Sequence, residues 1–244
     1  MKKNFLLIVL FVTTLLTGLV FNCKKDSTSN PADECPPVNG TPTDIGIKTT
    51  FTEEFERVYE LSVKGWVNKD NSPSGNSGVN AAWAQGYMGN GKGGPWYGFS
   101  AYSYTTSQDE FAYSPVHTTS TNRSTISSWL ITPVLSVKNG DKISFYTRSD
   151  TTGSYTERMQ VLMNRSAADN VGDRSGSVCG FTTVLLEINS GQTVGGYPTT
   201  WTKYEYTFTG ITGKTDTRIG FRHYVANTSN AKGIGIDLFK FEVN

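Results

Sequence analysis

Residues 201–225 read WTKYEYTFTGITGKTDTRIGFRHYV, and this stretch decides the fold class. Its first part carries aromatic rings at every second position: Tyr204, Tyr206 and Phe208. Its last part carries apolar side chains in one phase, namely Ile219, Phe221 and Val225. Because successive side chains of a β-strand point to opposite faces, this alternation predicts two half-buried strands. The glycine-containing residues between them predict a turn.

The same period of two recurs along the chain after residue 49. KISFYTR at 142–148 and RMQVLMN at 158–164 alternate apolar and polar side chains, and turn signals such as KNGDK at 138–142 and NSGQ at 189–192 separate the strands. Helical periodicity is weak there, with residues 51–62 as a short candidate. We therefore predict an all-β fold, an antiparallel two-sheet β-sandwich of the jelly-roll type.

The length and charge of the chain narrow its class further. A chain of 244 residues with 36% hydrophobic residues can bury the core of one all-β domain. The formal net charge is +1, and the lysine and arginine residues do not cluster beyond the N-terminal segment. Because nucleic-acid binding leaves a concentrated basic surface, we expect no nucleic-acid partner.

The N-terminus has the features of an export signal. Lys2 and Lys3 precede an apolar run at 5–20, which is shorter than the roughly 20 apolar residues of a spanning helix. The run ends just before Cys23, and this placement resembles a bacterial lipoprotein signal, in which the cysteine is diacylated and becomes the mature N-terminus. Asn22 stands where that signal usually has a small residue, so an ordinary cleaved signal or an uncleaved anchor stays open as the alternative.

Lipidation of Cys23 predicts the organisation of the whole chain. Two acyl chains would anchor the protein stably at a membrane, and residues 24–48 carry too few apolar side chains to offset the entropy of ordering. We expect a signal peptide at 1–22, a disordered tether at 23–48 and a jelly-roll domain at 49–244. The expected location is the outer membrane or cell surface of a Gram-negative bacterium, reached by export and held by the lipid.

The two other cysteines are Cys35 in the expected tether and Cys179 in the domain. An exported protein meets an oxidising compartment, in which such a pair can bridge. The sequence leaves two alternatives open, a Cys35–Cys179 disulfide or two free thiols.

Several segments follow one another in the order found in one domain family. They are SSWLITPVLSV (127–137), GDKISFYTRS (140–149), ERMQVLMN (157–164), the stretch from 201 to 224, and GIGIDLFKFEV (233–243). With them, the chain resembles bacterial choice-of-anchor J and cleaved-adhesin domains over roughly residues 50–244. The resemblance implies a MAM-like jelly roll without catalytic machinery, carried on a secreted or surface-anchored protein.

The segment 80–98 is the expected ligand surface. It is a glycine-rich loop that carries Trp83, Tyr87, Trp96 and Tyr97. Large rings on a surface loop, next to asparagine and glutamine, are typical of sugar-binding sites, and exposed apolar patches also mark protein contacts. The alternative is that the loop folds back over the edge of the sandwich. Residues 99–104 have rings on both faces, which predicts an interior strand.

Asp237 is a candidate metal ligand. It lies in phase with Phe239 and Phe241, so we expect it to face inward, where a carboxylate must be paired or metal-bound. In jelly rolls of the kind that the chain resembles, such an aspartate and an acidic residue of the first strand hold a structural calcium ion. Glu54 and Glu56 are the matching residues here, and spacing does not decide between them. A salt bridge or turn cap at Asp237 is the alternative.

The sequence offers little for catalysis. His223 is in phase with Ile219 and Phe221, which favours a packed strand residue over a general base. Cys179 could act as a nucleophile only with a base and an orienting group, and no recognisable partner motif is present. We expect a non-enzymatic envelope lipoprotein that binds a glycan or a surface or host protein. The alternatives are an assembly subunit of an envelope complex and, last, a hydrolase that uses Cys179.

Overall fold

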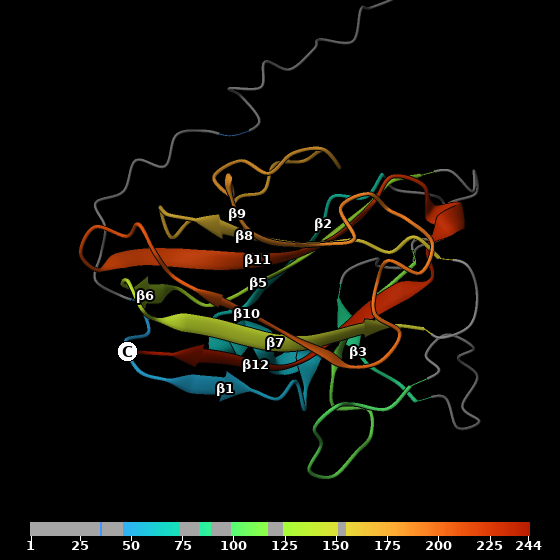
Figure 1. The fold of residues 1–244 in the computed structure, drawn as a ribbon, viewed down its shortest axis with the longest axis horizontal. Helices are drawn as coiled ribbons and strands as arrows, with labels where there is room; N and C mark the ends of the chain where they lie inside the picture. The colour runs from blue at the N-terminus through green and yellow to red at the C-terminus, as the bar shows by residue number, and fades with distance from the viewer. Residues whose placement is uncertain (1–34, 36–45, 74–82, 89–98, 117–123, 151–154) are drawn as a thin grey trace, which may run out of the picture. The chain divides into compact units, whose positions relative to one another are not determined.

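The described part of the chain forms two six-stranded sheets that lie one above the other (Figure 1). In this computed structural model the described residues are 35, 46–73, 83–88, 99–116, 124–150 and 155–244. The strands within each sheet pair antiparallel. The predicted antiparallel β-sandwich is thereby confirmed.

The first sheet, called the β12 sheet, has the order β10–β7–β12–β4–β3, with β1 also paired to β12. Its strands are β1 (Phe51–Glu53), β3 (Ala84–Gln85), β4 (Ala112–Pro115), β7 (Lys142–Ser149), β10 (Thr202–Thr207) and β12 (Gly233–Glu242). The second sheet, called the β11 sheet, has the order β2–β5–β11–β8–β9, with β6 also paired to β11. Its strands are β2 (Val67–Asp70), β5 (Ile126–Ile131), β6 (Leu135–Val137), β8 (Met159–Asn164), β9 (Thr183–Ile188) and β11 (Thr215–Val225).

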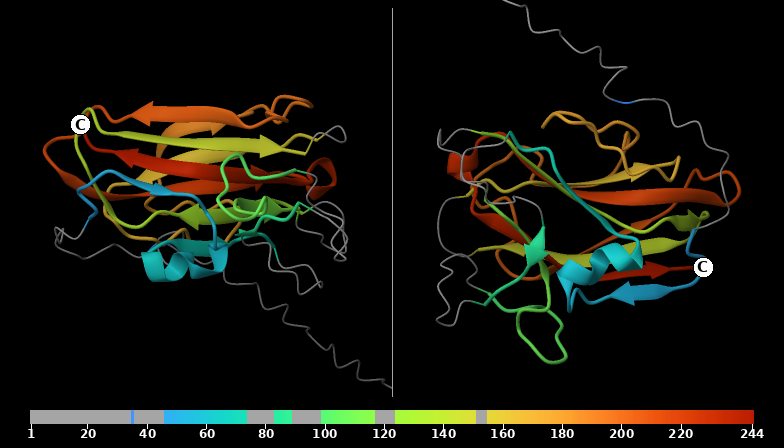
Figure 2. Two further views of the ribbon diagram at one scale, coloured as in Figure 1. Left: turned by 90° about the horizontal axis from the view of Figure 1, so that it is seen from below. Right: turned by 180° about the vertical axis from the view of Figure 1, so that it is seen from behind.

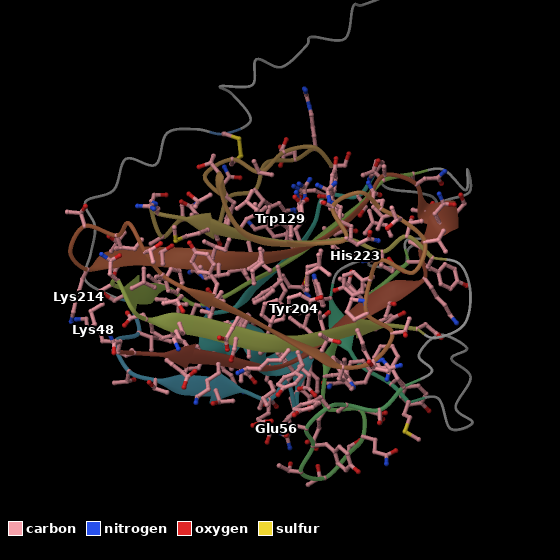
Figure 3. The ribbon with its side chains drawn as sticks, viewed as in Figure 1. Lys48, Glu56, Trp129, Tyr204, Lys214 and His223 are labelled. Atoms are coloured by element: carbon pink, nitrogen blue, oxygen red, sulfur yellow. A yellow bond between two sulfur atoms is a disulfide. The ribbon has the colours of Figure 1, made fainter. Side chains whose placement is uncertain are left out.

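The main core lies between the sheets because every second side chain of the central strands points inward. Phe221 of β11 meets Phe145 of β7 edge to face at 5.0 Å and Phe239 of β12 at 5.8 Å. Tyr204 of β10 is partly buried and packs against the same core (Figure 3). Burying one such side chain contributes about 1.5–3 kcal/mol. The burial of the alternating apolar side chains therefore stabilises the packing of the two sheets.

The short helix candidate at 51–62 is helical only in its last part, and the expected strand at 99–104 does not form. Residues 51–62 become β1 followed by the 3-10 helix η1 (Val58–Lys64), and a second short 3-10 helix, η2 (Thr228–Asn230), precedes β12. Residues 99–104 form no strand. Phe99 and Ala101 are buried, as an interior segment requires, but Tyr102 and Tyr104 are exposed. The segment instead covers a sheet from outside, so only one of its sides is buried.

Two segments outside the strands cover the outer faces of the sheets (Figure 1): residues 99–111, called the 99–111 segment, cover the β12 sheet, and the chain between β8 and β9 covers the β11 sheet. On the β12 sheet, Phe99 and Phe111 pack with Trp201 over Gly235, where a Cβ atom would lie only 3.0 Å from Phe99. On the β11 sheet, Phe181 packs on Trp129 of β5 at 5.4 Å. Each outer face therefore has a small apolar cluster of its own beside the main core.

The chain before β1 is tied to the domain at two points. Cys35 and Cys179 form a disulfide, with their Cα atoms 5.2 Å apart, which selects one of the two alternatives left open by the sequence. Ile47 pairs with β6: its N–H donates to the Val134 carbonyl, and its carbonyl accepts from the Ser136 N–H. Ile47 lies within the residues expected to be tether, so ordered contacts begin before residue 49.

The lipidation residue Cys23 and the signal peptide lie outside the described residues. Within the described ranges, no helix is both long and apolar enough to cross a bilayer.

Candidate functional site

A groove of about 370 Å³ opens beside η1, between β2, β3 and β5. η1 is the cyan helix at the front of the right-hand view in Figure 2. Leu61, Trp66, Trp83 and Leu130 are buried and line the floor. Tyr59 stands at the rim with 73% of its surface exposed. The groove thus offers an apolar floor and a free aromatic ring.

Two amide side chains hold the walls of this groove. The Asn68 side chain exchanges two hydrogen bonds with the Trp83 backbone, at 2.5 Å to its carbonyl and 3.1 Å from its N–H. The Gln85 Oε1 atom accepts from the Val58 N–H at 2.7 Å, and its Nε2 atom donates to the Asp109 carbonyl at 2.7 Å. The groove is therefore held open by bonds among four separate segments, and a ligand would meet a preformed site.

A polar groove of about 560 Å³ adjoins the first one, and Tyr59 and Gln85 line both. Charged residues of both signs line it: Glu56, Arg57, Glu60, Lys64, Asp109 and Glu110. Arg57 and Glu60 pair with each other at 3.1 Å, and Lys64 pairs with Glu53 at 2.9 Å. This second groove offers hydrogen-bond donors and acceptors next to the apolar floor of the first.

Glu110 fixes the loop that forms one wall of the polar groove. Its carboxylate accepts from the backbone N–H groups of Thr105 at 2.5 Å, Thr106 at 2.9 Å and Ser107 at 2.8 Å. Burial raises the pKa of Glu110, but these hydrogen bonds together with that from the Thr106 hydroxyl outweigh burial and lower the pKa to about 2. The loop is therefore latched by an ionised carboxylate.

Of the four predicted ligand residues, the structure describes two, Trp83 and Tyr87. Trp83 is only 2% exposed, and its Nε1 atom donates to the Ser128 carbonyl at 3.3 Å. The expectation of an exposed ring at this position is wrong, because the Trp83 indole fills the space beneath the groove. Tyr87 is half-buried. Trp96 and Tyr97 lie outside the described residues.

Asp237 lies on the outer face of the β12 sheet, which corrects the predicted inward orientation. Leu238 has a positive φ of 46°, and the register between β12 and β7 shifts just after Asp237. This β-bulge changes the phase, so Ile236 and Phe239 face the main core while Asp237 lies beneath the 99–111 segment. Asp237 Oδ2 accepts from the N–H groups of Tyr102 at 2.8 Å and Ser103 at 3.0 Å.

Of the two candidate acidic residues, Glu54 is the one whose charge acts on Asp237. Burial first, and the nearby Glu54 charge in addition, raise the pKa of Asp237 to about 7 against the effect of its backbone hydrogen bonds. The Glu54 Oε2 atom is buried and has no hydrogen-bond partner in the part of the chain that the structure describes. Glu56 instead is exposed and lines the polar groove. A second carboxylate whose charge acts on Asp237, and which has a buried oxygen, suits a hard cation such as calcium.

Among the described residues, this acid pair has no third ligand from a histidine, cysteine, aspartate or glutamate side chain. Within the described ranges, no group of three or more histidine, cysteine, aspartate or glutamate side chains is placed to hold a metal ion. A cation at Glu54 and Asp237 would therefore need further oxygen ligands from backbone carbonyls or water.

A serine, an imidazole and a carboxylate make contact between the two sheets. Ser114 Oγ of β4 lies 2.9 Å from His223 Nδ1 of β11, and His223 Nε2 lies 2.8 Å from Glu157 Oε2. All three side chains are 0% exposed, and Figure 3 shows His223 within the interior. A serine nucleophile is activated by a neighbouring base that a third group orients. Here all three side chains are buried in the core, where a substrate cannot reach them.

Sequence reasoning did not select Glu157 or Ser114. Glu157 lies in phase with Met159, Val161 and Met163, so the alternation of β8 carried a signal for an inward-facing carboxylate. Ser114 carried no comparable signal. Cys179, the other candidate nucleophile, has its sulfur in the disulfide and offers no thiolate, so the Cys179 hydrolase is excluded while that bond is intact.

Comparisons with known proteins agree with the fold. No protein-family model and no curated protein matches the chain. Among solved structures, the chain is similar to the K1 cleaved adhesin domain of Lys-gingipain from Porphyromonas gingivalis W83. The TM-score is 0.53 at 21% identity, over 80% of this chain and 99% of that domain. The K3 cleaved adhesin domain of the same protein matches at a TM-score of 0.48 and 16% identity, over 79% of this chain and 98% of that domain.

At these identities the likeness concerns the fold alone. The described domain is a jelly-roll β-sandwich similar to the K1 cleaved adhesin domain.

Proposed function

We propose that this protein is an exported, lipid-anchored binding module that holds a glycan and catalyses no reaction. The observation that carries the proposal is the groove beside η1, with its apolar floor and the exposed Tyr59 at its rim. Such a site suits a ligand with one apolar face and polar groups at its edge. The K1 neighbour is named an adhesin domain, which supports a binding role.

A sugar ring has the chemistry that both grooves together would recognise. Its C–H face can stack on the Tyr59 ring, as apolar faces stack on aromatic side chains. Its hydroxyl groups can exchange hydrogen bonds with Glu56 and Asp109 in the adjoining polar groove. Because the groove walls are already fixed by Asn68 and Gln85, little entropy would be lost on binding.

A glycan array with the mature protein tests this function. For at least one glycan that the wild type binds, the Tyr59→Ala variant should lose about tenfold or more in affinity, as expected for loss of one stacked ring in a site. Val184→Ser, at an exposed position on β9, is the matched control and should bind as the wild type does. Binding of every glycan by wild type and Tyr59→Ala with equal affinity would contradict the use of this groove.

A protein partner is the second candidate, because η1 exposes a second apolar side chain, Val63, besides Tyr59. Val63 is 85% exposed, although it is apolar. Exposed apolar groups that lie together mark protein contacts. An envelope protein that co-purifies with the wild type but not with a Tyr59→Ala/Val63→Ser variant would favour an assembly subunit over a glycan-binding module.

The anchor is part of the proposal. The Cys35–Cys179 disulfide supports export, since such bonds persist in oxidising compartments. Lipid on Cys23 would then tether the domain to the membrane. Mass spectrometry of the mature N-terminus should find a diacylated cysteine at residue 23, and an unmodified residue there would exclude the lipid anchor.

We also propose that Glu54 and Asp237 hold a structural calcium ion. The unpaired buried oxygen of Glu54 and the nearby Asp237 carboxylate support this assignment. The ion would neutralise the buried Asp237 and the partly buried Glu54, and it would join the residue that follows β1 to the bulge of β12.

A further inference from the structure

Two tyrosine rings stack on the outer face of the β12 sheet. Tyr146 stands on β7, and Tyr102 belongs to the 99–111 segment. Their ring centroids are 3.6 Å apart, their planes differ by 14°, and their hydroxyl groups are 3.0 Å apart. Neither residue lines the groove beside η1 or the polar groove.

The Tyr102 ring is exposed and yet fixed in place. It is 44% exposed, so its covered side is the one that stacks on Tyr146. Its backbone N–H donates to the buried Asp237 carboxylate at 2.8 Å, and the N–H of the preceding Ala101 donates to the Gln108 carbonyl at 2.8 Å. A ring that is already immobilised loses little side-chain entropy when a ligand packs on it.

Charged side chains stand on the two strands that flank β7. Lys203 of β10 is the register partner of Tyr146 and pairs with Glu205 at 3.2 Å. On β12, Lys240 pairs with Glu242 at 2.7 Å. All four charged side chains are more than 40% exposed. The face therefore combines one flat apolar ring with donors and acceptors at its edge.

We propose that the Tyr102–Tyr146 stack is a second binding surface, which takes a pyranose ring of a glycan. The C–H face of the sugar would pack on the free face of Tyr102, and its hydroxyl groups would bond to Lys203 and Glu205. A folded protein partner would need a much larger apolar contact area than this ring, which has ion pairs on the two strands that flank β7. The inference shares with the proposed function only the glycan class of the ligand, because the two surfaces have no residue in common.

The chain allows a matched set of variants. Tyr102→Phe keeps the flat ring and removes the hydroxyl. Tyr102→Leu keeps an apolar side chain and removes the ring, and Tyr102→Ala removes both. Tyr59→Ala removes the exposed ring of the groove beside η1. Near-ultraviolet circular dichroism and the unfolding midpoint of each variant report whether the 99–111 segment stays in place.

The experiment is a glycan array of pyranose oligosaccharides, followed by calorimetric titration of the strongest hits into the mature protein. For at least one glycan we expect about tenfold weaker binding by Tyr102→Ala and by Tyr102→Leu. For that glycan, Tyr102→Phe should stay within about threefold of wild type. Val184→Ser, at an exposed position of β9 outside both surfaces, should bind as wild type does.

Equal binding of every glycan by wild type, Tyr102→Ala and Tyr102→Leu would overturn the inference. If Tyr59→Ala then abolished binding, the glycan-binding function would stand, with the groove as its site. Failure of the wild type to hold any glycan would overturn the inference and the proposed function together.

Discussion

His223 Nε2 lies 2.8 Å from Glu157 Oε2, and both side chains are fully buried between the two sheets. Glu157 also accepts through Oε1 from the N–H groups of Lys232 at 2.5 Å and Gly233 at 2.7 Å. On the other side of the imidazole, Ser114 belongs to the β12 sheet. One carboxylate and one imidazole therefore connect the two sheets through four hydrogen bonds. We infer from this geometry that Glu157 and His223 stabilise the fold.

Removal of Glu157 should destabilise the fold strongly. Glu157→Ala would leave two backbone N–H groups and the His223 ring buried without their acceptor, and breaking such a buried pair costs about 3–5 kcal/mol. Urea unfolding of the variant measures this loss. Glu205→Ala, which removes an exposed ion pair with Lys203, is the control and should change stability by about 1 kcal/mol or less. A loss below about 1 kcal/mol at Glu157 would contradict the assignment.

Loss of the disulfide should lower stability and leave the sandwich intact. The bridge joins residues separated by 144 positions in the sequence. Closing so long a loop restricts the unfolded chain, and removing the bridge should cost about 2–5 kcal/mol. We expect this loss in Cys35→Ser/Cys179→Ser by chemical unfolding, and no change in Cys23→Ser. Equal stability of the double variant in oxidising conditions would show that the bond does not constrain the chain.

Acid should release the loop that Glu110 latches. The pKa of Glu110 in the folded state is lowered to about 2 from an ordinary 4.5. The folded state therefore favours the ionised carboxylate, and its stabilisation is present above pH 4.5 and disappears as the pH falls through 2.

Glu110→Gln isolates this contribution. The difference in unfolding free energy between wild type and Glu110→Gln should be constant at neutral pH and should shrink as the pH falls from 4.5 toward 2. Urea unfolding across that range measures it. A difference that does not depend on pH would mean that the latch does not need the charge.

Chelation of calcium should lower the melting temperature of the wild type. A ligand that binds only the folded state at 100 times its Kd stabilises by about 2.7 kcal/mol. Asp237→Asn and Glu54→Gln should lose the response to calcium, whereas Glu56→Gln should keep it, because Glu56 lines the polar groove. Calcium-independent melting of the wild type would exclude the ion. Loss of the calcium response in Glu56→Gln would show that Glu56, and not Glu54, is the acidic ligand.

The alternation of apolar and polar residues made the fold predictable. A backbone bulge that the alternation does not reveal made the predicted orientation of Asp237 wrong. Period-two spacing identified β10 and the core face of β11, including His223 as a packed residue. In β12 the spacing stayed regular while the backbone did not, since Leu238 adopts a positive φ. A leucine gives no sequence signal for a bulge, so Asp237 was assigned to the wrong face.

The candidate site was less predictable than the fold because it depends on contacts between distant segments. The indole of Trp83 is buried since its N–H meets the Ser128 carbonyl, 45 residues away. The exposed ring of the groove is Tyr59, in a 3-10 helix that the sequence indicated only weakly. Neither the burial of Trp83 nor the exposure of Tyr59 beside a groove follows from the local sequence pattern. Both depend on how η1, β2, β3 and β5 pack against one another.

The most direct test of binding without catalysis is calorimetric titration of the mature protein with a glycan retained on the array, followed by mass spectrometry of the recovered glycan. We predict saturable binding that Tyr59→Ala weakens, with the glycan recovered at its original mass. A glycan recovered in cleaved form, or wild-type protein that binds no glycan, would contradict a non-catalytic glycan-binding module.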